Sequence, residues 1–330
     1  MSYRPLTGPE EIELFCRLSY VLDHELTDDF ANGCRRPEWT WVALDGDRLL
    51  ARLAWWTTPG GDIPLQFDFF DIDDTLPKAD HDEIGRRLFK TATAAVFPAG
   101  AKLPEYGRFV PPDWREDPAA REVVESRTRL LESTGARLLV ERLRLQWTPS
   151  SLLPESKGRL VFRPVADRED LLALMTPVME GTLDAHGQAD LASGLTSREA
   201  AERHYDGEFA RLKSPHEWWR IAELPDGGGS VGFVIPARNS YHPIIAYIGV
   251  LPAHRGNGYI DEILAEGTHI LAAEGVDRIR ASTDLGNVPM AKAFARAGYV
   301  NFERSLNLVW DWPPLLRLRI SPQTAFAPRS

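Results

Sequence analysis

The sequence lacks the features that place a protein in or across a membrane. No apolar stretch of about 18 residues, the length that a membrane-spanning helix needs, occurs among its 330 residues. The first residues, MSYRPLTGPEEIELF, contain no basic segment followed by an apolar core, which is the pattern of a secretory signal. We therefore expect a cytoplasmic protein that does not bind a membrane.

Cysteine and positive charge are also scarce. Cys16 and Cys34 are the only cysteines, and their spacing fits neither a metal site nor a disulfide framework, so we expect two buried thiols and no metal. Lys and Arg number 38 against 48 Asp and Glu, which gives a net charge of −10. Because nucleic acids and anionic membranes bind clustered Lys and Arg, this balance argues against both and favours a small neutral or cationic partner.

The chain contains an internal repeat. Hydrophobic residues make up 43% of its 330 residues, which is enough for two packed interiors, and the length exceeds that of one ordinary domain. Three segments of the first half recur in the second at offsets of 159, 179 and 163: YRPL from Tyr3 with FRPV from Phe162, EWTWVAL from Glu38 with EWWRIAEL from Glu217, and GARLLVERLRLQW from Gly135 with GYVNFERSLNLVW from Gly298. The halves therefore read as two copies of one domain.

The offsets also locate an insertion and the domain boundaries. The second copy carries about 20 extra residues near 178–197, and the Pro-bearing segment 148–158 reads as a linker. We predict a first domain over 1–150, a second over 159–315 and a C-terminal tail over 316–330.

The second copy has the pattern of a mixed α/β domain. Strands are predicted at 160–165, 217–224, 231–238, 242–250, 277–283 and 299–312, and helices at 167–178, 197–212, from 259 onward and at 287–297. The segment 225–230, PDGGGS, suits the turn of a hairpin. The sequence thus predicts an α/β fold with one mixed sheet in each copy.

One junction of this domain has the chemistry of a phosphate site. YIGVLPAHRGNGYIDEILAEG, residues 247–267, joins a strand to a helix that begins near Tyr259. Gly256 and Gly258 permit backbone angles that direct successive N–H groups into one concavity, and the positive end of the helix dipole faces the same place. Arg255 can add charge to a bound phosphate. The alternative is that RGNG is only a tight turn.

This junction resembles the central motif of the GNAT family of acyl-CoA-dependent N-acetyltransferases, V-x-P-x-x-R/Q-G-x-G-x-G/A. Val250, Pro252, Arg255, Gly256 and Gly258 stand at matching positions. Downstream, NVPMAKAFARAGY supplies the family's Asn as Asn287 and its terminal Gly-aromatic pair as Gly298 and Tyr299. The resemblance covers residues 160 to about 312 well and the first half in outline.

The resemblance implies two tandem GNAT-like domains and a site for acetyl-CoA. In this family the fourth strand separates from the fifth, pantetheine pairs with the fourth strand in the gap, and the glycine loop binds the pyrophosphate. On this chain it assigns the acetyl-CoA contacts to Ile248, Val250, Arg255, Gly256, Asn257, Gly258, Tyr259, Asn287 and Phe294.

Two positions depart from the family pattern. Ile260 replaces the small residue that usually ends the phosphate motif, which should not prevent binding by backbone N–H groups. Phe294 stands where many members carry a Tyr that protonates the departing thiolate of CoA. A phenyl ring cannot donate a proton, but a thiol with a pKa near 8.5 leaves tolerably as thiolate, so slower or differently assisted chemistry is expected.

The sequence leaves more than one candidate for the general base. Asp284, at the end of the fifth strand, is the nearest carboxylate, although Asp before a Gly-Asn turn is commonly a turn residue. Tyr247 and, after it, His242 are the alternatives on the fourth strand. Glu180, Asp184 and His186 of the inserted segment suit substrate contacts better than base catalysis.

The first copy has no equivalent loop. Its segment DTLPKADHDEIGRRLF lacks R-G-x-G, and its carboxylates, at Asp73, Asp74, Asp80, Asp82 and Glu83, would repel a pyrophosphate. We expect this copy to have lost the cofactor and to serve by packing, by closing the acceptor cleft or by supporting a homodimer.

The sequence therefore predicts an acetyltransferase that moves an acetyl group directly from acetyl-CoA to the primary amine of a small molecule. A non-catalytic acyl-CoA binding or sensing module is the alternative, because of Phe294. A third hypothesis is that the two domains have only a structural or protein-interaction role, and the intact RGNG loop argues against it.

Overall fold

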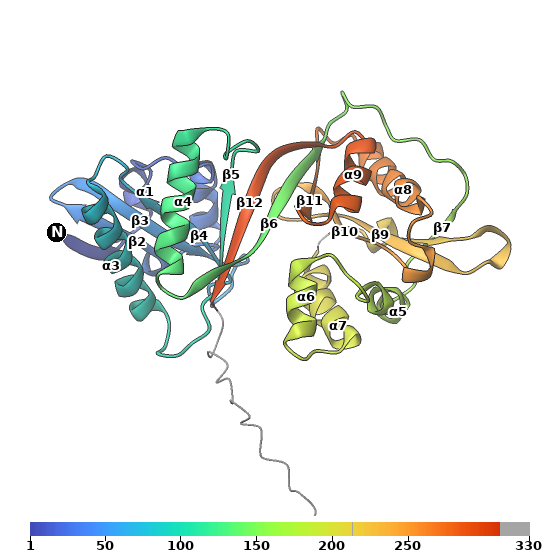
Figure 1. Cartoon of the computed structure of the whole chain (residues 1–330), viewed down its shortest axis with the longest axis horizontal. Coiled ribbons are helices and arrows are strands. Elements are labelled where there is room, and N and C mark those ends of the chain that lie inside the picture. Colours follow the sequence, from blue (N-terminus) through green and yellow to red (C-terminus); the bar gives the residue numbers. More distant parts are fainter. Residues whose placement is uncertain (213, 311–330) are drawn as a thin grey trace, which may run out of the picture. The chain divides into compact units, whose positions relative to one another are not determined.

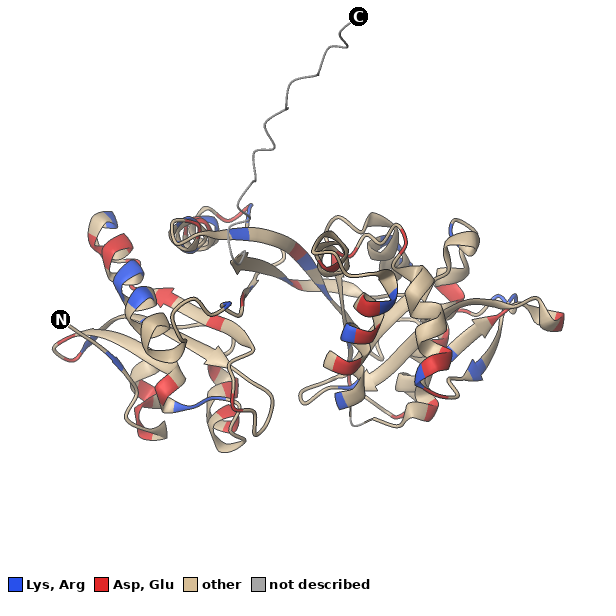
Figure 2. Ribbon diagram, turned by 90° about the horizontal axis from the view of Figure 1, so that it is seen from below, with Lys and Arg blue, Asp and Glu red and all other residues tan. Residues whose placement is uncertain are grey.

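The computed structural model describes residues 1–212 and 214–310, which form two compact units (Figure 1). Unit 1 contains residues 1–105 and 128–137 together with residues 309–310, and unit 2 contains residues 106–127 and 138–308. The predicted tail, 316–330, lies outside the described residues. Figure 2 shows charged residues distributed over both units. Within the described part of the chain, no helix combines the length and the apolar character that crossing a membrane requires.

Unit 1 is built on an antiparallel sheet whose strands follow one another in the order β1-β2-β3-β4. Their bounds are Ser2–Pro5, Thr40–Asp45, Arg48–Trp56 and Gln66–Ile72. The α-helices of unit 1 are α1 (Ile12–Phe15), α2 (Leu26–Ala31), α3 (Lys78–Val96) and the last residues of α4 (Pro118–Glu132). Almost every residue of β2, β3 and β4 is buried, as expected for strands covered on both faces.

Two arginines lie inside unit 1. Arg35 is 1% exposed and donates to Asp29 and to both oxygens of Asp68, at 2.6 to 2.9 Å. Arg52 is fully buried and bonds Asp71 and Asp23. Both guanidinium groups also lie within 5 Å of the Phe69 ring centroid, at 4.7 and 4.9 Å. Such charges are tolerated inside a protein only when they are paired and hydrogen-bonded.

Unit 2 contains a mixed sheet in the order β5-β12-β6-β11-β10-β9-β8-β7. β10 and β11 run parallel, and the other pairs with a recorded register are antiparallel. In chain order the strands are β5 (Glu105–Val110), β6 (Ala136–Trp147), β7 (Val161–Pro164), β8 (Arg220–Glu223), β9 (Ser230–Arg238), β10 (Pro243–Val250), β11 (Ile279–Asp284) and β12 (Val300–Trp310).

The two copies exchange their last strands. β6, which ends the first copy, pairs with β11 from Asp284↔Arg142 to Ile279↔Trp147, and β12, which ends the second copy, pairs with β5. As a result β5 and most of β6 pack in unit 2, although both belong to the first predicted domain. The compact units therefore do not coincide with the sequence domains 1–150 and 159–315, whose boundaries stay a prediction about the repeat.

Helices cover both faces of the unit 2 sheet. α5 (Arg168–Val178) and α7 (Ser197–Gly207) pack on one face against Phe233 and Ile235, whereas α8 (Tyr259–Ala273) and α9 (Val288–Arg296) pack on the other with Val234. Adjacent residues of β9 thus point to opposite layers, as strand geometry requires. The order and the type of most elements match the prediction, but α6 (Ala185–Ala192), inside the inserted segment, was missed.

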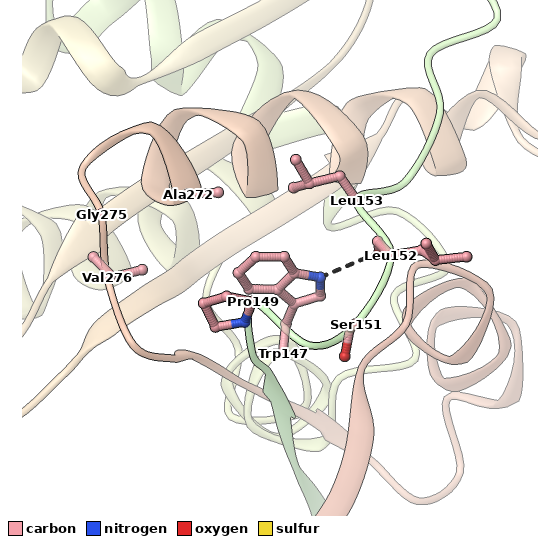
Figure 3. A pocket seen from close by; sticks show the side chains of 8 residues that line it. All are labelled: Trp147, Pro149, Ser151, Leu152, Leu153, Ala272, Gly275 and Val276. Carbon is pink, nitrogen blue, oxygen red and sulfur yellow. Dashed lines mark hydrogen bonds between the residues drawn. The ribbon is translucent and has the colours of Figure 1, made fainter.

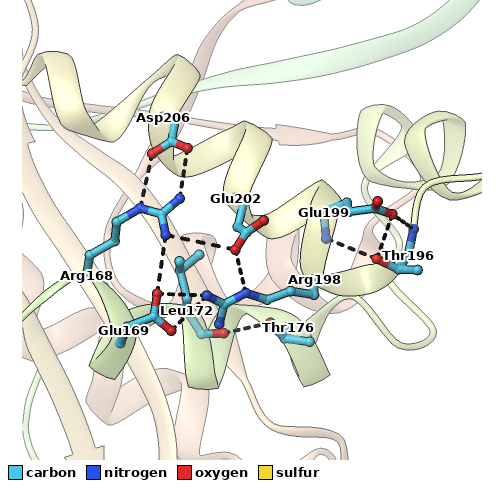
Figure 4. A network of polar contacts seen from close by, with 9 residues as sticks. All are labelled: Arg168, Glu169, Leu172, Thr176, Thr196, Arg198, Glu199, Glu202 and Asp206. Carbon is cyan, nitrogen blue, oxygen red and sulfur yellow. Dashed lines mark hydrogen bonds and ion pairs between the residues drawn. The ribbon is translucent and has the colours of Figure 1, made fainter.

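A network of ion pairs joins α5 and α7 at the surface (Figure 4). Arg168 pairs with Asp206 at 2.8 Å, and Arg198 pairs with Glu169 at 2.7 Å and Glu202 at 2.8 Å. Since these side chains are at least one-third exposed, each pair contributes little to stability.

The internal repeat is visible in atomic contacts. In the first copy Arg4 donates to Glu11, which also accepts from the backbone N–H of Thr7. In the second copy Arg163 donates to Asp170, which accepts from the N–H of Ala166. All three positions are shifted by the same 159 residues, so the first strand and first helix of each copy are joined in the same way.

The buried arginines of unit 1 give a stability prediction. Arg35→Met leaves Asp68 buried without the cation that pairs with both of its oxygens, and it should lower the free energy of unfolding by about 3 to 5 kcal/mol. Arg36→Met is the matched control, because Arg36 pairs with the exposed Asp62 and its loss should cost under about 1 kcal/mol. Urea unfolding of the full chain measures both, and equal shifts of the two variants would contradict the assignment.

Candidate functional site

The predicted separation of two strands is present in unit 2. β10 pairs with β9 along its whole length, but it pairs with β11 only through Ile244↔Arg280. A β-bulge interrupts β10 between Ile245 and Tyr247, just beyond that pair. Among residues 1–212 and 214–310, no strand pairs with the edge of β10 that faces β11 from the bulge to Val250, so this edge can pair with an extended ligand.

The glycine loop follows directly. Gly256 and Gly258 have φ angles of +81° and +70°, the left-handed region in which side chains are strained. Gly258 is the N-cap of α8 and supplies no side-chain cap, so the first N–H groups of the helix have no side-chain acceptor there. Asn257 braces the loop by donating to the carbonyls of His254 and Arg255. Free helix N–H groups at the positive end of a dipole form an anion site.

The side chain of Arg255 is engaged with three backbone carbonyls. Its Nε donates to the carbonyl of Val250 at 3.2 Å, Nη1 to that of Glu180 at 2.7 Å and Nη2 to that of Val178 at 2.8 Å. These contacts join the end of β10 to the end of α5, whose last carbonyls have no partner within the helix. Arg255 is thus a brace for the junction, and its contribution to phosphate charge stays a prediction.

Arg159, which the sequence did not identify, contacts the loop instead. Its Nη1 and Nη2 donate to the carbonyls of Asn257 and Gly258 at 2.9 and 3.0 Å. Its Nε and backbone N–H donate to the fully buried carboxylate of Glu262 at 2.5 and 2.9 Å. The guanidinium group also lies 4.8 Å from the ring centroid of Tyr259. One residue therefore holds both the loop and the first turn of α8.

The first turn of α8 carries two carboxylates that would repel a phosphate if they were unpaired. Glu262 is neutralised by Arg159, and Asp261 pairs with Arg296 of α9 at 2.6 Å. The positive end of the helix dipole is thereby kept available to an anion.

Asn287 and Phe294 lie on α9. The Asn287 side chain is the N-cap of this helix and accepts from the N–H of Met290 at 3.3 Å. Phe294 is 2% exposed and packs edge-to-face on Tyr299 at 5.1 Å, inside the core between the sheet and α8. The Tyr299 hydroxyl is 2.9 Å from the Thr268 hydroxyl, and burial raises its pKa, so this phenol is a core group.

Asp284 and Tyr247, the two candidate catalytic residues, are both near the inserted segment. Asp284 is 3% exposed, accepts from the N–H of Ala185 at 2.6 Å and forms an ion pair with Arg142 at 3.1 Å. Burial raises the pKa of Asp284, while the Ala185 N–H and Arg142 act against the rise. The ring centroids of Tyr247 and His204 are 4.8 Å apart. Burial raises the pKa of the Tyr247 hydroxyl, so this group is a proton donor at neutral pH.

The other candidates have different surroundings. Asp184 is the N-cap of α6 and accepts from the N–H of Gly187, which is the role of a cap. Glu180 contributes its backbone carbonyl to Arg255. His242 lies at the turn before β10, at the opposite end of that strand from the glycine loop, and burial together with nearby arginines lowers its pKa.

A pocket of about 420 Å³ in unit 2 does not belong to this site (Figure 3). It lies between the linker and the carboxyl end of α8, whereas the glycine loop lies at the amino end, about 20 Å away along a 15-residue helix. None of its lining residues is charged: Trp147, Pro149, Ser151, Leu152, Leu153, Ala272, Gly275 and Val276. It therefore offers nothing to a phosphate.

The loop of the first copy differs as the sequence predicted. It joins β4 to α3 without glycine, and its Asp73 is already engaged by Arg48 and Thr75. His81 on α3 lies between Asp74 and Asp82.

Comparisons with known proteins agree with this geometry. A family model described as an acetyltransferase (GNAT) domain matches residues 159–300. No curated protein matches the chain in sequence. A GCN5-related N-acetyltransferase from Sphaerobacter thermophilus is 16% identical, with 93% of this chain and 94% of that chain covered and a TM-score of 0.55.

Two further solved structures are less similar. An acetyltransferase of the GNAT family from Colwellia psychrerythraea is 13% identical over 94% of this chain and 100% of its own, with a TM-score of 0.48. A tandem GNAT protein from the clavulanic acid biosynthesis pathway is 15% identical over 93% and 97%, with a TM-score of 0.49. The strand separation and the glycine loop both lie within residues 159–300, the part of the chain that matches the acetyltransferase (GNAT) domain.

Proposed function

We propose that unit 2 transfers an acetyl group directly from acetyl-CoA to the primary amine of a small molecule. The observation that carries this proposal is the start of α8, where two glycines with positive φ precede first-turn N–H groups without a side-chain cap, beside the unpaired edge of β10. That arrangement suits a ligand with a phosphate at one end and an extended, amide-bearing arm at the other, which is the chemistry of CoA.

The two ends of the donor would be bound by different means. The pyrophosphate would be held by backbone N–H groups around Gly256, Asn257, Gly258 and Tyr259, with the side chain of Arg159 keeping the loop in place. The pantetheine arm would pair with the edge of β10 at Ile248 and Val250. Asn287, at the start of α9, would contact the arm from the opposite side.

Transfer follows from placing a neutral amine beside the thioester. The amine nitrogen forms a bond to the carbonyl carbon, the carbon–sulfur bond breaks, and CoA leaves as thiolate. The ammonium proton passes to a base or to water, and the thiolate takes a proton from a donor or from water. The backbone N–H of Val250 would polarise the carbonyl, because the N–H of Leu251 already donates to the carbonyl of Val231 at 2.8 Å.

Asp284 and Tyr247 are the residues that we assign to the proton transfers. Asp284 has a raised pKa and lies at the end of β11, so it is the carboxylate best placed to accept a proton. Tyr247 stays protonated at neutral pH and is a donor, a role that Phe294 cannot fill. His242 is less suitable, since it lies at the far end of β10.

The alternative is a binding or sensing module that no longer performs chemistry. One observation favours it: the ring of Phe294 is packed in the core, at the position where the family's Tyr protonates the leaving group. The two functions differ in whether CoA is released. The expected cytoplasmic location belongs to either proposal, because acetyl-CoA is a cytoplasmic metabolite.

Gly258 tests the donor site. Gly258→Val forces a β-branched residue into the left-handed region and disturbs the N–H groups of the loop, so affinity for acetyl-CoA should fall about tenfold or more, or ~1.4 kcal/mol. Gly275→Val is the matched control, since Gly275 has a φ of +67° but lies beyond the other end of α8. Calorimetry on the full chain should also give one site per chain. Equal losses in both variants, or two sites, would contradict the assignment.

Arg159 tests how the loop is held. Arg159→Gln should weaken acetyl-CoA binding about tenfold, because the carbonyls of Asn257 and Gly258 lose their donors. It should also destabilise the protein, because Glu262 is left buried without a cation. The double variant Arg159→Gln, Glu262→Gln removes that charge and should recover Tm without recovering affinity. Recovery of both together would show that Arg159 matters only for stability.

Release of CoA separates enzyme from binding module. Wild type with acetyl-CoA and a panel of small primary amines should release CoA with at least one of them. Phe294→Tyr should change that rate by less than about tenfold, because a thiolate leaves with little assistance and general acids contribute most where protonation limits the rate. Release by Phe294→Tyr alone, with none by wild type, would establish the binding module instead.

A further inference from the structure

A group of arginines lies on the face of the unit 2 sheet opposite α8 and α9. On β11, Ile279 and Ala281 belong to the core beneath those helices, so Arg280, Ser282 and Asp284 point to the other face. The register of β6 places Gln146, Arg144 and Arg142 directly opposite these three residues, on the same face.

Most of these arginines have a carboxylate partner, and one does not. Arg142 pairs with Asp284, Arg144 with Glu303 and Arg278 with Asp277. Within residues 1–212 and 214–310, no hydrogen bond or ion pair of the Arg280 side chain is recorded, and its Nε is buried without an acceptor. We refer to Arg144, Arg278 and Arg280 as the arginine cluster.

Aromatic rings fix the orientation of two of these guanidinium groups. Arg280 lies 3.7 Å from the ring centroid of Phe302, and Arg144 lies 3.6 Å from that of Phe109. Stacking on a ring leaves the edge of a guanidinium group, where its N–H donors are, directed sideways. Arg280 is therefore held in place with its donors uncommitted.

Positive charge is in excess at this place. Three guanidinium groups are balanced by two carboxylates, Glu303 and Asp277. Burial, and then the charges of Arg144 and Arg278, lower the pKa of Arg280 to about 10. Burial and the same three arginines also lower the pKa of His242, which favours the neutral form of its ring. An unpaired, half-buried cation is unfavourable for folding, and a bound anion would offset that cost.

The cluster lies at the closed end of the gap between β10 and β11. Arg280 is itself the residue that pairs with Ile244, and the glycine loop begins beyond Val250, about 20 Å farther along an extended strand. If the donor enters from the glycine loop, the open end is filled by CoA, and the amine must approach the thioester from the remaining side. The cluster lies on that side.

We propose that the arginine cluster binds an anionic group of the acceptor, a carboxylate or a phosphate, and that Arg280 is its principal donor. This rests on the proposed function. Guanidinium groups bind both anions through paired N–H donors, and Arg280 has donors to give. Nearby positive charge also favours the neutral, nucleophilic form of the acceptor's amine. The substrate class is thus a small amine that carries an acidic group.

Matched pairs of amines test the proposal on the full chain with acetyl-CoA. Each pair differs by one acidic group: tyramine with tyrosine, histamine with histidine and cadaverine with lysine for carboxylate, and ethanolamine with phosphoethanolamine for phosphate. In at least one pair the acidic member should have a kcat/KM about tenfold higher or more, equivalent to ~1.4 kcal/mol. The arm in which this occurs identifies the anion.

Arg280→Gln should remove that preference, mainly through KM, and leave the neutral member within about twofold. Its Tm should hold or rise, because an unpaired cation is lost, whereas a residue with a structural role would lower Tm. Arg198→Gln, in the exposed network of Figure 4, is the control and should change neither amine. Neutral members that react as well as acidic ones, or an equal loss for both in Arg280→Gln, would overturn the proposal.

Failure of the proposed function is distinguishable from failure of the subsite. If acetyl-CoA binds but no amine in any pair releases CoA, the transferase proposal fails. Calorimetry with inorganic phosphate as the probe then tests whether the arginine cluster binds an anion. Saturable binding that Arg280→Gln abolishes supports it, and binding that is absent or unchanged in the variant refutes it.

Discussion

The separation of β10 from β11 is the constraint around which unit 2 is arranged. After the single pair Ile244↔Arg280, both strands would expose unpaired peptide groups in the middle of a sheet, which is costly unless something else pairs with them. β10 keeps β9 on its other side, and β11 keeps β6. The gap can therefore stay open without loss of the sheet, and it leaves the facing edges of β10 and β11 open to an extended ligand.

That arrangement gives the first copy a reason to persist without a phosphate loop. The strand that supports β11 opposite the gap is β6, which belongs to the first copy in sequence, and β12 of the second copy pairs with β5 in return. Loss of the first copy would expose the edge of β11 beside the proposed site. The fold of unit 2 does not depend on a phosphate loop in the first copy, but it does depend on the last strand of that copy, β6, which pairs with β11.

Local patterns in the sequence were enough to predict the glycine loop, the start of α8 and nearly all strands of the second copy, because each depends on neighbouring residues. Contacts between distant residues could not be predicted in this way. Arg159 is separated by 98 residues from the carbonyl of Asn257, and nothing in the residues around it indicates this contact. Arg255 was expected to add charge to a bound phosphate, and its donors are directed to the carbonyls of Val178, the last residue of α5, and of Glu180 just after it, which only the folded chain brings near. The strand exchange cannot be predicted from hydrophobic periodicity, because β6 would show the same alternation of residues whether it paired within its own copy or with β11.

Charge connects the two ends of the proposed site. A chain with a net charge of −10 repels anions on average, so an anionic donor needs local compensation. At the start of α8 this is achieved by neutralising Asp261 and Glu262 with Arg296 and Arg159, which leaves the helix N–H groups to act. At the closed end of the gap, positive charge exceeds negative charge. Arg144 and Arg278 already pair with Glu303 and Asp277, and Arg280 adds a third cation. Neutralising the nearby carboxylates does not require this extra cation, whereas binding an anionic acceptor does.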